Sequence, residues 1–288
     1  MPDAPRTTPW IVAVAVTFNR RDLVTRLVTE TGRGTVLPDE ILVVDNASTD
    51  DTVALLRAAA CEHPHLTVHE MGGNAGYAAA VNAAFARAPG RDVLVINPDV
   101  QLDGGEPILA LADVLEREPG VGVVAPRLLG DDGETQPNAR LFPTLAAMLG
   151  STGLARLAPA LGRSYDRFVS PSKSDRARTV DWVIGGAMLI RRAAFNAAGG
   201  WDERFFLYIE DTDFCRRCIR AGWDVAYVPS VRLYHRYPRA SRNTGPFATS
   251  RARRSHVMGL ARLWWREPGL IVGIGRGEGR ELDHGGGS

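Results

Sequence analysis

The chain has 288 residues, 45% of them hydrophobic, which is enough to bury a substantial core. A formal net charge of +1 points to no class of charged partner, and we expect no nucleic-acid binding. Three cysteines, Cys61, Cys215 and Cys218, are too few and odd in number for a disulfide framework, so we expect a cytoplasmic protein.

The apolar run Ile11–Phe18 follows Arg6 and could be mistaken for the core of a signal peptide. It is short, however, and runs into Asn19-Arg20-Arg21 without a small-residue cleavage site. No stretch reaches the roughly 18 apolar residues that cross a bilayer. We therefore predict a buried strand here and a protein that is soluble or peripheral to the membrane.

Apolar, strand-like runs alternate with helical segments over the first 126 residues. The predicted strands are Ile11–Phe18, Glu40–Val44, Leu66–His69, Asp92–Ile96 and Val121–Ala125. The helices predicted between them are Arg21–Glu30, Thr52–Ala60, Tyr77–Arg87 and Pro107–Glu118. This order predicts an α/β fold with a doubly wound, mainly parallel sheet that binds ligands at the carboxyl ends of its strands.

The pattern is less regular after residue 126. Between Arg127 and Arg178, proline and glycine separate short helical pieces such as Leu145–Leu149 and Leu154–Leu161, and no function follows from them. Later elements are a strand Val180–Ile190 interrupted by Gly185-Gly186, a helix Arg191–Ala198, a helix starting near Asp211, and strands Val225–Val228 and Val231–Tyr234. We expect the terminal glycine tail to be flexible.

Two loops after predicted strands could contact a nucleotide. The Asp45 carboxylate could accept hydrogen bonds from a ribose or base, or it could form a capping turn with the residues around Ser48. The loop Gly73-Asn74-Ala75-Gly76 could let a ligand approach the backbone, or it could be only a tight turn. Neither loop is a G-x-G-x-x-G fingerprint, which disfavours a nicotinamide enzyme.

Asn97-Pro98-Asp99 places a carboxylate just past the end of a central strand. A divalent cation that bridges a diphosphate needs only one or two protein carboxylates, and it neutralises charge on the leaving group. The alternative is a turn that merely ends the strand. His235 also follows a predicted strand, and it is either a metal ligand or a hydrogen-bonded structural residue.

Three carboxylates, Glu210, Asp211 and Asp213, follow an aromatic run that begins at Phe205. Acidic residues in a first helical turn are favoured by the helix dipole, which is the structural alternative. A carboxylate in a partly dry pocket is also a candidate general base. The C-x-x-C spacing that follows has no second pair and no redox context, and we predict structural cysteines.

Taken together in this order, these segments resemble the family 2 glycosyltransferases, especially the bacterial rhamnosyltransferase-like branch. The matching stretches are Val14–Arg20, Val43–Ser48, Gly73–Gly76, Asn97–Val100, Trp182–Arg191 and Gly199–Asp213. The resemblance implies the nucleotide-diphospho-sugar transferase fold, which is Rossmann-like and of GT-A type.

The resemblance also implies a role for each matched position. Nucleotide-binding positions would be Thr17, Asn19, Asp45, Ser48, Asn74, Gly76 and Asn97. Asp99 and His235 would hold Mg²⁺ or Mn²⁺, Asp211 would be the catalytic base, and Trp182, Gly185, Gly186 and Glu210 would shape the donor and acceptor pocket. Asn97-Pro98-Asp99 carries one carboxylate where many relatives have two.

The implied reaction is an inverting transfer of one sugar, L-rhamnose from dTDP-rhamnose. The sugar would leave its nucleoside diphosphate for a hydroxyl of a glycan or polyprenyl-linked acceptor in cell-wall synthesis. The absence of a Q-x-x-R-W motif argues for a single transfer and against processive synthesis. Two alternatives are a nucleotidyltransferase, which Lys173 as the only lysine disfavours, and an inactive nucleotide-sugar-binding module.

We expect residues 1–240 to form the transferase domain, with a nucleotide-binding half at 10–126 and an acceptor half at 127–240. Residues 241–288 would add a basic helical extension and a tail. Nine arginines and one acid lie from Arg232 to Glu267, and the apolar residues near helical spacing are Val257, Leu260, Ala261, Trp264 and Trp265. Residues 250–266 could therefore lie on the inner face of the plasma membrane, or they could form an ordinary packing helix.

Overall fold

The computed structural model describes residues 11–21, 40–102, 105–236, 251–274 and 279–282. The predicted helix Arg21–Glu30, apart from its first residue, and the glycine tail lie outside these ranges.

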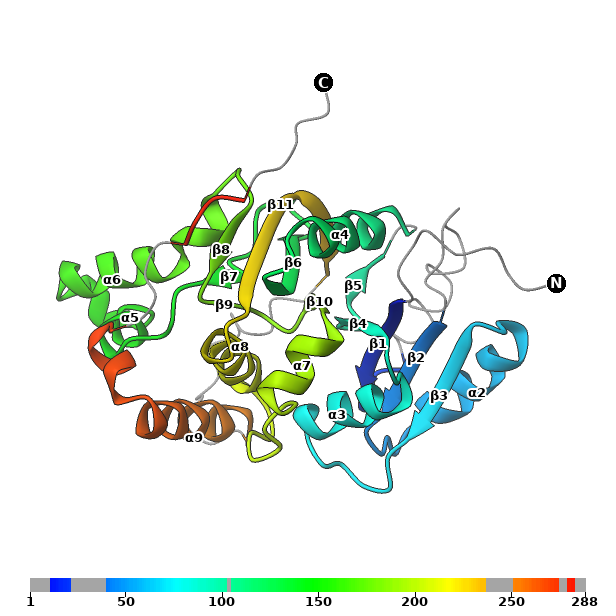
Figure 1. Cartoon of the computed structure of the whole chain (residues 1–288). Helices are drawn as coiled ribbons and strands as arrows, with labels where there is room; N and C mark the ends of the chain where they lie inside the picture. Colours follow the sequence, from blue (N-terminus) through cyan, green and yellow to red (C-terminus); the bar gives the residue numbers. More distant parts are fainter. Residues whose placement is uncertain (1–10, 22–39, 103–104, 237–250, 275–278, 283–288) are drawn as a thin grey trace.

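A mixed sheet organises the molecule (Figure 1). Its first part is parallel, in the order β3-β2-β1-β4. Strand β10 continues the sheet antiparallel to both β4 and β6, and β11 and β5 follow, with β8 paired to β11. The strands are β1 (Ile11–Thr17), β2 (Glu40–Asp45), β3 (Leu66–Glu70), β4 (Asp92–Ile96), β5 (Val100–Gln101), β6 (Val121–Leu129), β8 (Arg178–Val180), β10 (Ala187–Ile190) and β11 (Asp224–His235). The predicted α/β class is confirmed, and the sheet is parallel in its first part and mixed beyond β4.

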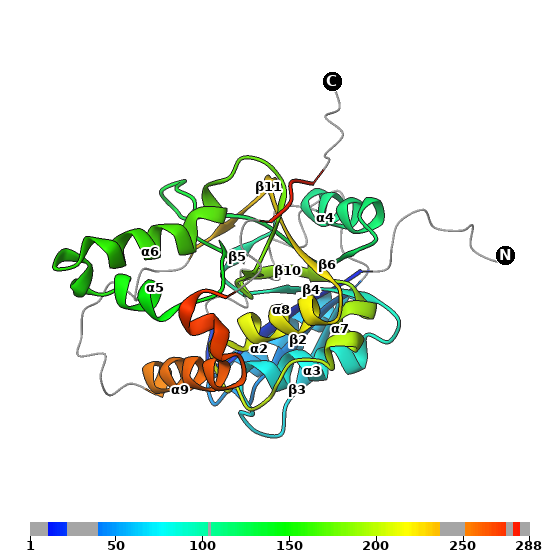
Figure 2. The same ribbon diagram turned by 60° about the vertical axis from the view of Figure 1, so that its left-hand side comes forward.

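Helices cover both faces of the sheet because its central strands are apolar on both sides. In β1, Val12, Val14 and Val16 face one core layer, and Ile11 and Ala13 face the other. Figure 2 shows α3, α7 and α8 on one face and α4 on the other. The helices are α2 (Thr52–Glu62), α3 (Tyr77–Arg87), α4 (Glu106–Arg117), α7 (Arg192–Ala198) and α8 (Glu210–Arg220).

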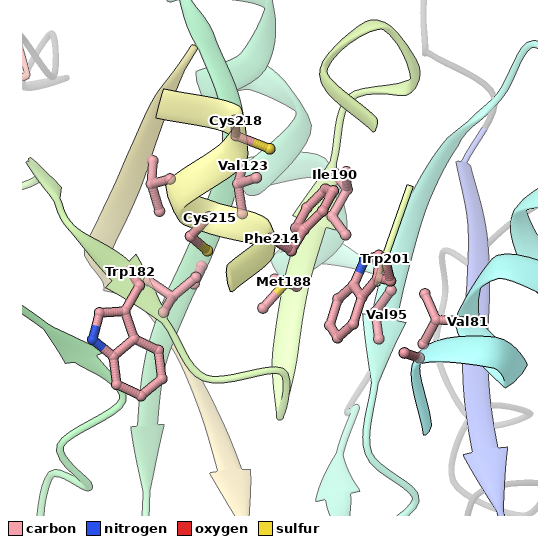
Figure 3. Packing of buried hydrophobic residues seen from close by; sticks show 14 of the residues in the cluster. Val81, Val95, Val123, Trp182, Met188, Ile190, Trp201, Phe214, Cys215 and Cys218 are labelled. Carbon is pink, nitrogen blue, oxygen red and sulfur yellow. The ribbon is translucent and has the colours of Figure 1, made fainter. Parts of the chain in front are cut away.

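Helix α8 packs on the sheet through its Phe214, Cys215 and Cys218 side chains, opposite Met188 of β10 (Figure 3). Both cysteines are buried and unpaired, and burial raises the pKa of each thiol, to about 12 for Cys218. The prediction that these cysteines are structural is confirmed.

Several predicted boundaries are wrong. Strand β6 runs through Pro126 instead of ending before it, and the two late strands are one strand, β11, with a register shift between Val228 and Arg232. The single strand predicted at 180–190 is three, because its middle part, β9 (Trp182–Val183), leaves the main sheet and pairs with β7 (Ala139–Arg140).

The irregular region forms a helical layer beside this small ribbon. It contains α5 (Leu145–Gly150), a 3₁₀ turn η1 (Gly153–Arg156), α6 (Pro159–Val169) and η2 (Ser170–Lys173). The predicted helix Leu154–Leu161 is wrong. Ala158 has a non-helical backbone, with φ −134° and ψ 89°, because it precedes Pro159, and the proline then begins a new helix.

Helix α9 (Arg251–Arg266) and the turn η4 (Pro268–Val272) close the described chain, and α9 lies beside α8 (Figure 1). Leu260 and Leu263 of α9 are buried in the main core. The Trp264 indole donates to the Pro143 carbonyl at 2.9 Å. Of the helices described in the structure, none has the length and apolar character that a bilayer crossing requires.

Candidate active site

The polar residues singled out above gather at one edge of the sheet, where the parallel strands β1, β2 and β4 end. Thr17 and Asp45 are register partners at the last positions of β1 and β2. Ile96, the last residue of β4, pairs with Ala187 at the start of the antiparallel strand β10. Topology thus brings the loops after residues 17, 45 and 96 and the loop before 187 to the same edge.

Asp45 is buried and organises its own loop. Its carboxylate accepts hydrogen bonds from the Ser48 backbone N–H at 2.8 Å and from the Ser48 hydroxyl at 2.5 Å. The Ser48 hydroxyl also accepts from the backbone N–H of Asn19, and the Asn19 side chain accepts from the Thr49 N–H at 2.7 Å. These bonds tie the β1 and β2 loops together. Thr17 is buried beside them, and its hydroxyl makes no hydrogen bond among the described residues.

Asn46, the neighbour of Asp45, joins this loop to the glycine loop. Its amide donates to the Asn74 side chain and to the Gly76 carbonyl, both at 3.1 Å, and its oxygen accepts from the Ala75 N–H. Gly76 itself has a φ of +95°, and a Cβ there would stand 2.6 Å from the Phe206 carbonyl oxygen. The position therefore requires glycine, because the chain of residue 206 crosses against it.

Tyr77 connects the glycine loop with the next two segments of the edge. Its hydroxyl is 3.3 Å from the Asn97 side-chain oxygen and 3.2 Å from the Gly185 carbonyl oxygen. The Asn97 N–H donates to the Gly186 carbonyl at 2.8 Å. Burial raises the pKa of Tyr77 above its usual value, and the charges of Glu210, Asp211 and Asp99 raise it further, so the phenol remains a hydrogen-bond donor at neutral pH.

Asp99 and His235 face each other because β5 pairs with the end of β11. The His235 Nε2 atom is 3.1 Å from an Asp99 carboxylate oxygen. At the other side of the ring, His235 Nδ1 is 2.7 Å from the side-chain oxygen of Gln136, whose amide nitrogen donates to the His235 carbonyl at 2.9 Å. The bond from the amide nitrogen to the His235 carbonyl fixes the orientation of the Gln136 amide. The amide oxygen therefore faces His235 and accepts a hydrogen bond from Nδ1–H.

This tautomer suits a metal ligand. With the proton on Nδ1, a neutral imidazole presents the Nε2 lone pair to the Asp99 oxygen, an arrangement that is favourable only with a proton or a cation between them. Two ligands of one octahedral cation, each about 2.1 Å from it at right angles, stand about 3 Å apart. The observed 3.1 Å fits that spacing. No group of three or more potential ligands occurs among the described residues, so a cation here would need oxygens from a diphosphate or water.

The first turn of α8 divides its three carboxylates among different surroundings. Glu210 is buried and one of its carboxylate oxygens makes no hydrogen bond among the described residues. Asp213 is buried and paired with Arg217 at 2.7 Å and Arg266 at 3.3 Å. Asp211 alone is partly exposed, with no arginine or histidine in ion-pair contact among the described residues.

Asp211 is held by two backbone donors, the Gly185 N–H at 3.0 Å and the Thr212 N–H at 2.7 Å. Burial nevertheless raises the pKa of Asp211, and these two bonds and the nearby Arg140 charge only partly oppose the effect. Burial and the charge of Asp211 raise the pKa of Glu210 well above its usual value. A positioned carboxylate with a raised pKa is suited to accept a proton near neutral pH.

A strained turn presents these carboxylates. Tyr208 and Ile209, just before α8, have φ values of +68° and +70°. Left-handed backbone is costly for a β-branched residue such as Ile209, and strain of this kind is common at functional sites.

Trp182 and Arg140 are register partners in the β7–β9 ribbon. The Trp182 indole is buried and donates to the Leu141 carbonyl at 2.7 Å. The Arg140 guanidinium lies 5.2 Å from the Trp182 ring centre, and its charge acts to lower the pKa of Asp211.

The predicted site residues thus form three connected groups. The first group is joined by the bonds around Asp45 and Asn46 and contains Asn19, Asp45, Ser48, Asn74 and Gly76. The second is joined by Tyr77 and backbone bonds and contains Asn97, Gly185, Gly186 and Asp211. The third is the pair Asp99 and His235. Thr17 lies at the end of β1, Glu210 directly precedes Asp211 in α8, and Trp182 lies three residues before Gly185.

Sequence reasoning missed Asn46, Tyr77, Gln136 and Arg140. Asn46 lies within the matched stretch Val43–Ser48 and Tyr77 directly follows the stretch Gly73–Gly76, but neither was chosen as a site residue. Gln136 and Arg140 lie in the irregular region, where no sequence signal marked them.

Comparison with known proteins places these features in context. The model of glycosyl transferase family 2 matches residues 12–197, and that of glycosyl transferase family group 2 matches residues 164–272. The N-acetylglucosaminyl-diphospho-decaprenol L-rhamnosyltransferase of Mycobacterium tuberculosis is 33% identical over 280 residues, covering 91% of this chain and 88% of the relative. The rhamnosyltransferase WbbL of Escherichia coli is 27% identical, covering 68% of this chain and 72% of the relative.

Two solved structures share the fold. One is the mannosyltransferase PcManGT from Pyrobaculum calidifontis in complex with GDP-Man and Mn²⁺, with a TM-score of 0.62 and 20% identity. The other is GalNAc-T7 with UDP, GalNAc and Mn²⁺, with a TM-score of 0.65 and 13% identity. Each match covers 90% of this chain, which spans 65% of the first neighbour and 48% of the second. The predicted GT-A type of fold is confirmed.

Proposed function

Because this chain belongs to glycosyl transferase family 2 and is a glycosyltransferase, we propose that it transfers one L-rhamnose from dTDP-rhamnose to a sugar hydroxyl of a polyprenyl-diphosphate-linked acceptor, with inversion. The donor sugar and the acceptor class follow the name of the mycobacterial relative, which matches along most of both chains. The product would serve cell-envelope polysaccharide synthesis.

Asp211 is the general base of this proposal. Its partly exposed carboxylate takes the proton of the acceptor hydroxyl as the hydroxyl oxygen forms its bond to the anomeric carbon. The bond between that carbon and the diphosphate breaks on the opposite face, and its electron pair leaves with the nucleoside diphosphate. One in-line displacement inverts the anomeric carbon.

Asp99 and His235 would hold a divalent cation, with Gln136 fixing the histidine tautomer. When bound, such a cation would neutralise the charge that develops on the leaving diphosphate. The solved Mn²⁺ complexes of structural neighbours support this cofactor.

The Asp45 loop and the Asn74–Gly76 loop would bind the nucleoside. Asp45 still has free acceptor capacity on its carboxylate, and Thr17 has an unused hydroxyl at the adjacent strand end. Gly76 allows the Asn74–Gly76 loop to pack against residue 206, because a Cβ at this position would collide with the Phe206 carbonyl oxygen.

Helix α9 would contact the membrane that carries the acceptor. Its inner side packs on the core through Leu260 and Leu263, while Val257, Met258 and Trp265 point outward, with Trp265 89% exposed. Exposed tryptophan beside arginine suits an anionic lipid surface.

The observation that carries the proposal is the position of Asp211, a partly exposed carboxylate with a raised pKa at the edge that also holds the Asp99–His235 pair. The test is to incubate the purified protein with a panel of nucleotide sugars and a short-chain GlcNAc-diphospholipid acceptor. We expect nucleoside diphosphate release and a rhamnosylated product with dTDP-rhamnose. A product only with another donor would refute the sugar assignment.

A further inference from the structure

Arg140 occupies an unusual environment for a cationic side chain. It belongs to the two-residue strand β7, and its guanidinium lies 5.3 Å from the Phe168 ring centre and 5.2 Å from that of Trp182. Its Nε donates to the Pro137 carbonyl at 2.6 Å. The rings and this bond fix the plane and direction of the guanidinium.

Within the described part of the chain, the Arg140 side chain forms no ion pair and no other hydrogen bond. Most other arginines near the site are paired: Arg217 and Arg266, for example, both reach Asp213. Burial lowers the pKa of Arg140, so the fold desolvates this charge without supplying a carboxylate in contact with it. A desolvated guanidinium is costly unless an anion compensates it, and its terminal N–H groups match a phosphate in a two-pronged contact.

Strand pairing connects Arg140 to the segment that holds the proposed base. Its strand partner Trp182 precedes Gly185, whose N–H holds Asp211, and the Arg140 charge acts on the pKa of Asp211. His256 of α9 packs against Tyr208, with ring centres 5.7 Å apart, and burial and the Arg140 charge lower the pKa of His256. The Arg140 charge therefore acts both on the proposed base and on the helix that carries the exposed tryptophan.

Two diphosphates take part in the proposed reaction. That of the donor would be held at the Asp99–His235 pair, which borders Gly186, whereas Asp211 borders Gly185. The acceptor diphosphate would join a sugar at Asp211 to a lipid near α9, and the charge of Arg140 acts on a group at each end of that route.

We propose that Arg140 binds the diphosphate that links the acceptor sugar to its lipid, and so selects diphospholipid acceptors. This inference rests on the proposed function for the identity of the ligand. It makes Arg140 a specificity-determining residue outside the nucleotide and cation sites.

The first experiment compares two acceptors, octyl-diphospho-GlcNAc and the octyl glycoside of GlcNAc, with dTDP-rhamnose as donor. In the wild type we expect KM at least tenfold lower for the diphosphate acceptor. Arg140→Gln should remove this preference, Arg140→Lys should retain part of it, and the KM of the donor should not change. Arg163→Gln, which removes the same charge from an exposed position on α6, is the matched control and should behave as wild type.

The second experiment needs no turnover. Binding of inorganic pyrophosphate is measured by tryptophan fluorescence in the presence of EDTA, which removes the contribution of a cation-bound diphosphate. We expect Arg140→Gln to weaken binding at least tenfold while Arg163→Gln does not, with all variants checked for equal melting temperature.

The two experiments separate the possible failures. Absence of transfer with every acceptor would contradict the proposed function, whereas the pyrophosphate measurement would still test Arg140. Equal pyrophosphate binding by wild type and Arg140→Gln, or an Arg140→Gln variant that raises the donor KM and keeps the acceptor preference, would overturn the inference.

Discussion

Asp211→Asn should separate catalysis from stability. The substitution removes the proton acceptor, and general-base catalysis contributes about 10²- to 10⁴-fold, or about 2.7–5.5 kcal/mol of the activation barrier. We therefore expect kcat to fall by at least about 100-fold while the substrate KM values change little. The asparagine can accept only one of the two N–H bonds, from Gly185 or Thr212, so about 1 kcal/mol is lost.

That loss is opposed by the removal of a desolvated charge, since burial raises the pKa of Asp211. The melting temperature should thus remain within about 2 °C of the wild type.

Asp213→Asn is the matched control, two residues along the same helix. Asp213 is paired with Arg217 and Arg266 and lies away from the glycine turn that contacts Asp211. Burial outweighs these arginines and raises the pKa of Asp213, which moderates the cost of neutralising it. We expect a loss of about 2 kcal/mol, or about 4 °C, with kcat within about threefold of the wild type.

Steady-state kinetics and thermal melting of both variants provide the assay. An Asp211→Asn protein that keeps kcat within about threefold and melts normally would refute the assignment of the base. The same conclusion would follow if Asp213→Asn lost more activity than Asp211→Asn.

Three further substitutions test neighbouring features. Glu210 has a raised pKa in the folded state, so its stabilising contribution is present at low pH and is lost as pH rises through that pKa. The melting temperature of Glu210→Gln should therefore increase relative to that of the wild type as pH rises from 4.5 to about 9. A difference that stays constant over this range would contradict the reasoning. His235→Ala should raise the Mg²⁺ or Mn²⁺ concentration for half-maximal activity at least about tenfold, an effect that metal titration after EDTA treatment measures and that an unchanged titration would exclude. Gly76→Ala should cost about 2–4 kcal/mol in urea unfolding because its Cβ would meet a backbone carbonyl, whereas Gly73→Ala, in open space, should cost under about 1 kcal/mol; equal costs would show that the turn yields.

The nucleotide-binding half of the fold was predictable because its signals are local. Strands such as Asp92–Ile96 are continuous apolar runs buried on both faces, and the helix Tyr77–Arg87 has the predicted bounds. Pro126 was misjudged for a physical reason that only pairing reveals. Pro126 pairs with Val228 of β11 on one side. On the other side, the ladder of β6 with β10 covers only residues 123 and 124, so the missing N–H of Pro126 removes no hydrogen bond from that ladder.

The site was predictable where it follows strand ends and unpredictable where it depends on distant contacts. Asp45 is the last residue of β2 and Asp99 lies three residues after β4, so their place at the ligand edge follows from the topology. The different surroundings of Glu210 and Asp211 could not be predicted from the sequence, because they depend on the Gly185 N–H, which donates to Asp211 and not to Glu210. Arg140 required the pairing of β7 with β9, which joins segments 42 positions apart and has no local pattern. The predicted division into domains at residue 240 remains a prediction.

The strained turn before α8 explains why the C-terminal helix matters for chemistry at Asp211. Two successive left-handed residues cost about 1–3 kcal/mol each, so the surrounding structure must hold them in place. On one side the Phe206 carbonyl accepts the Tyr77 N–H at 2.9 Å. On the other side α9 packs so closely that a Cβ at Gly259 would stand 3.1 Å from Ile209. Helix α9 thus contributes to the position of the proposed base.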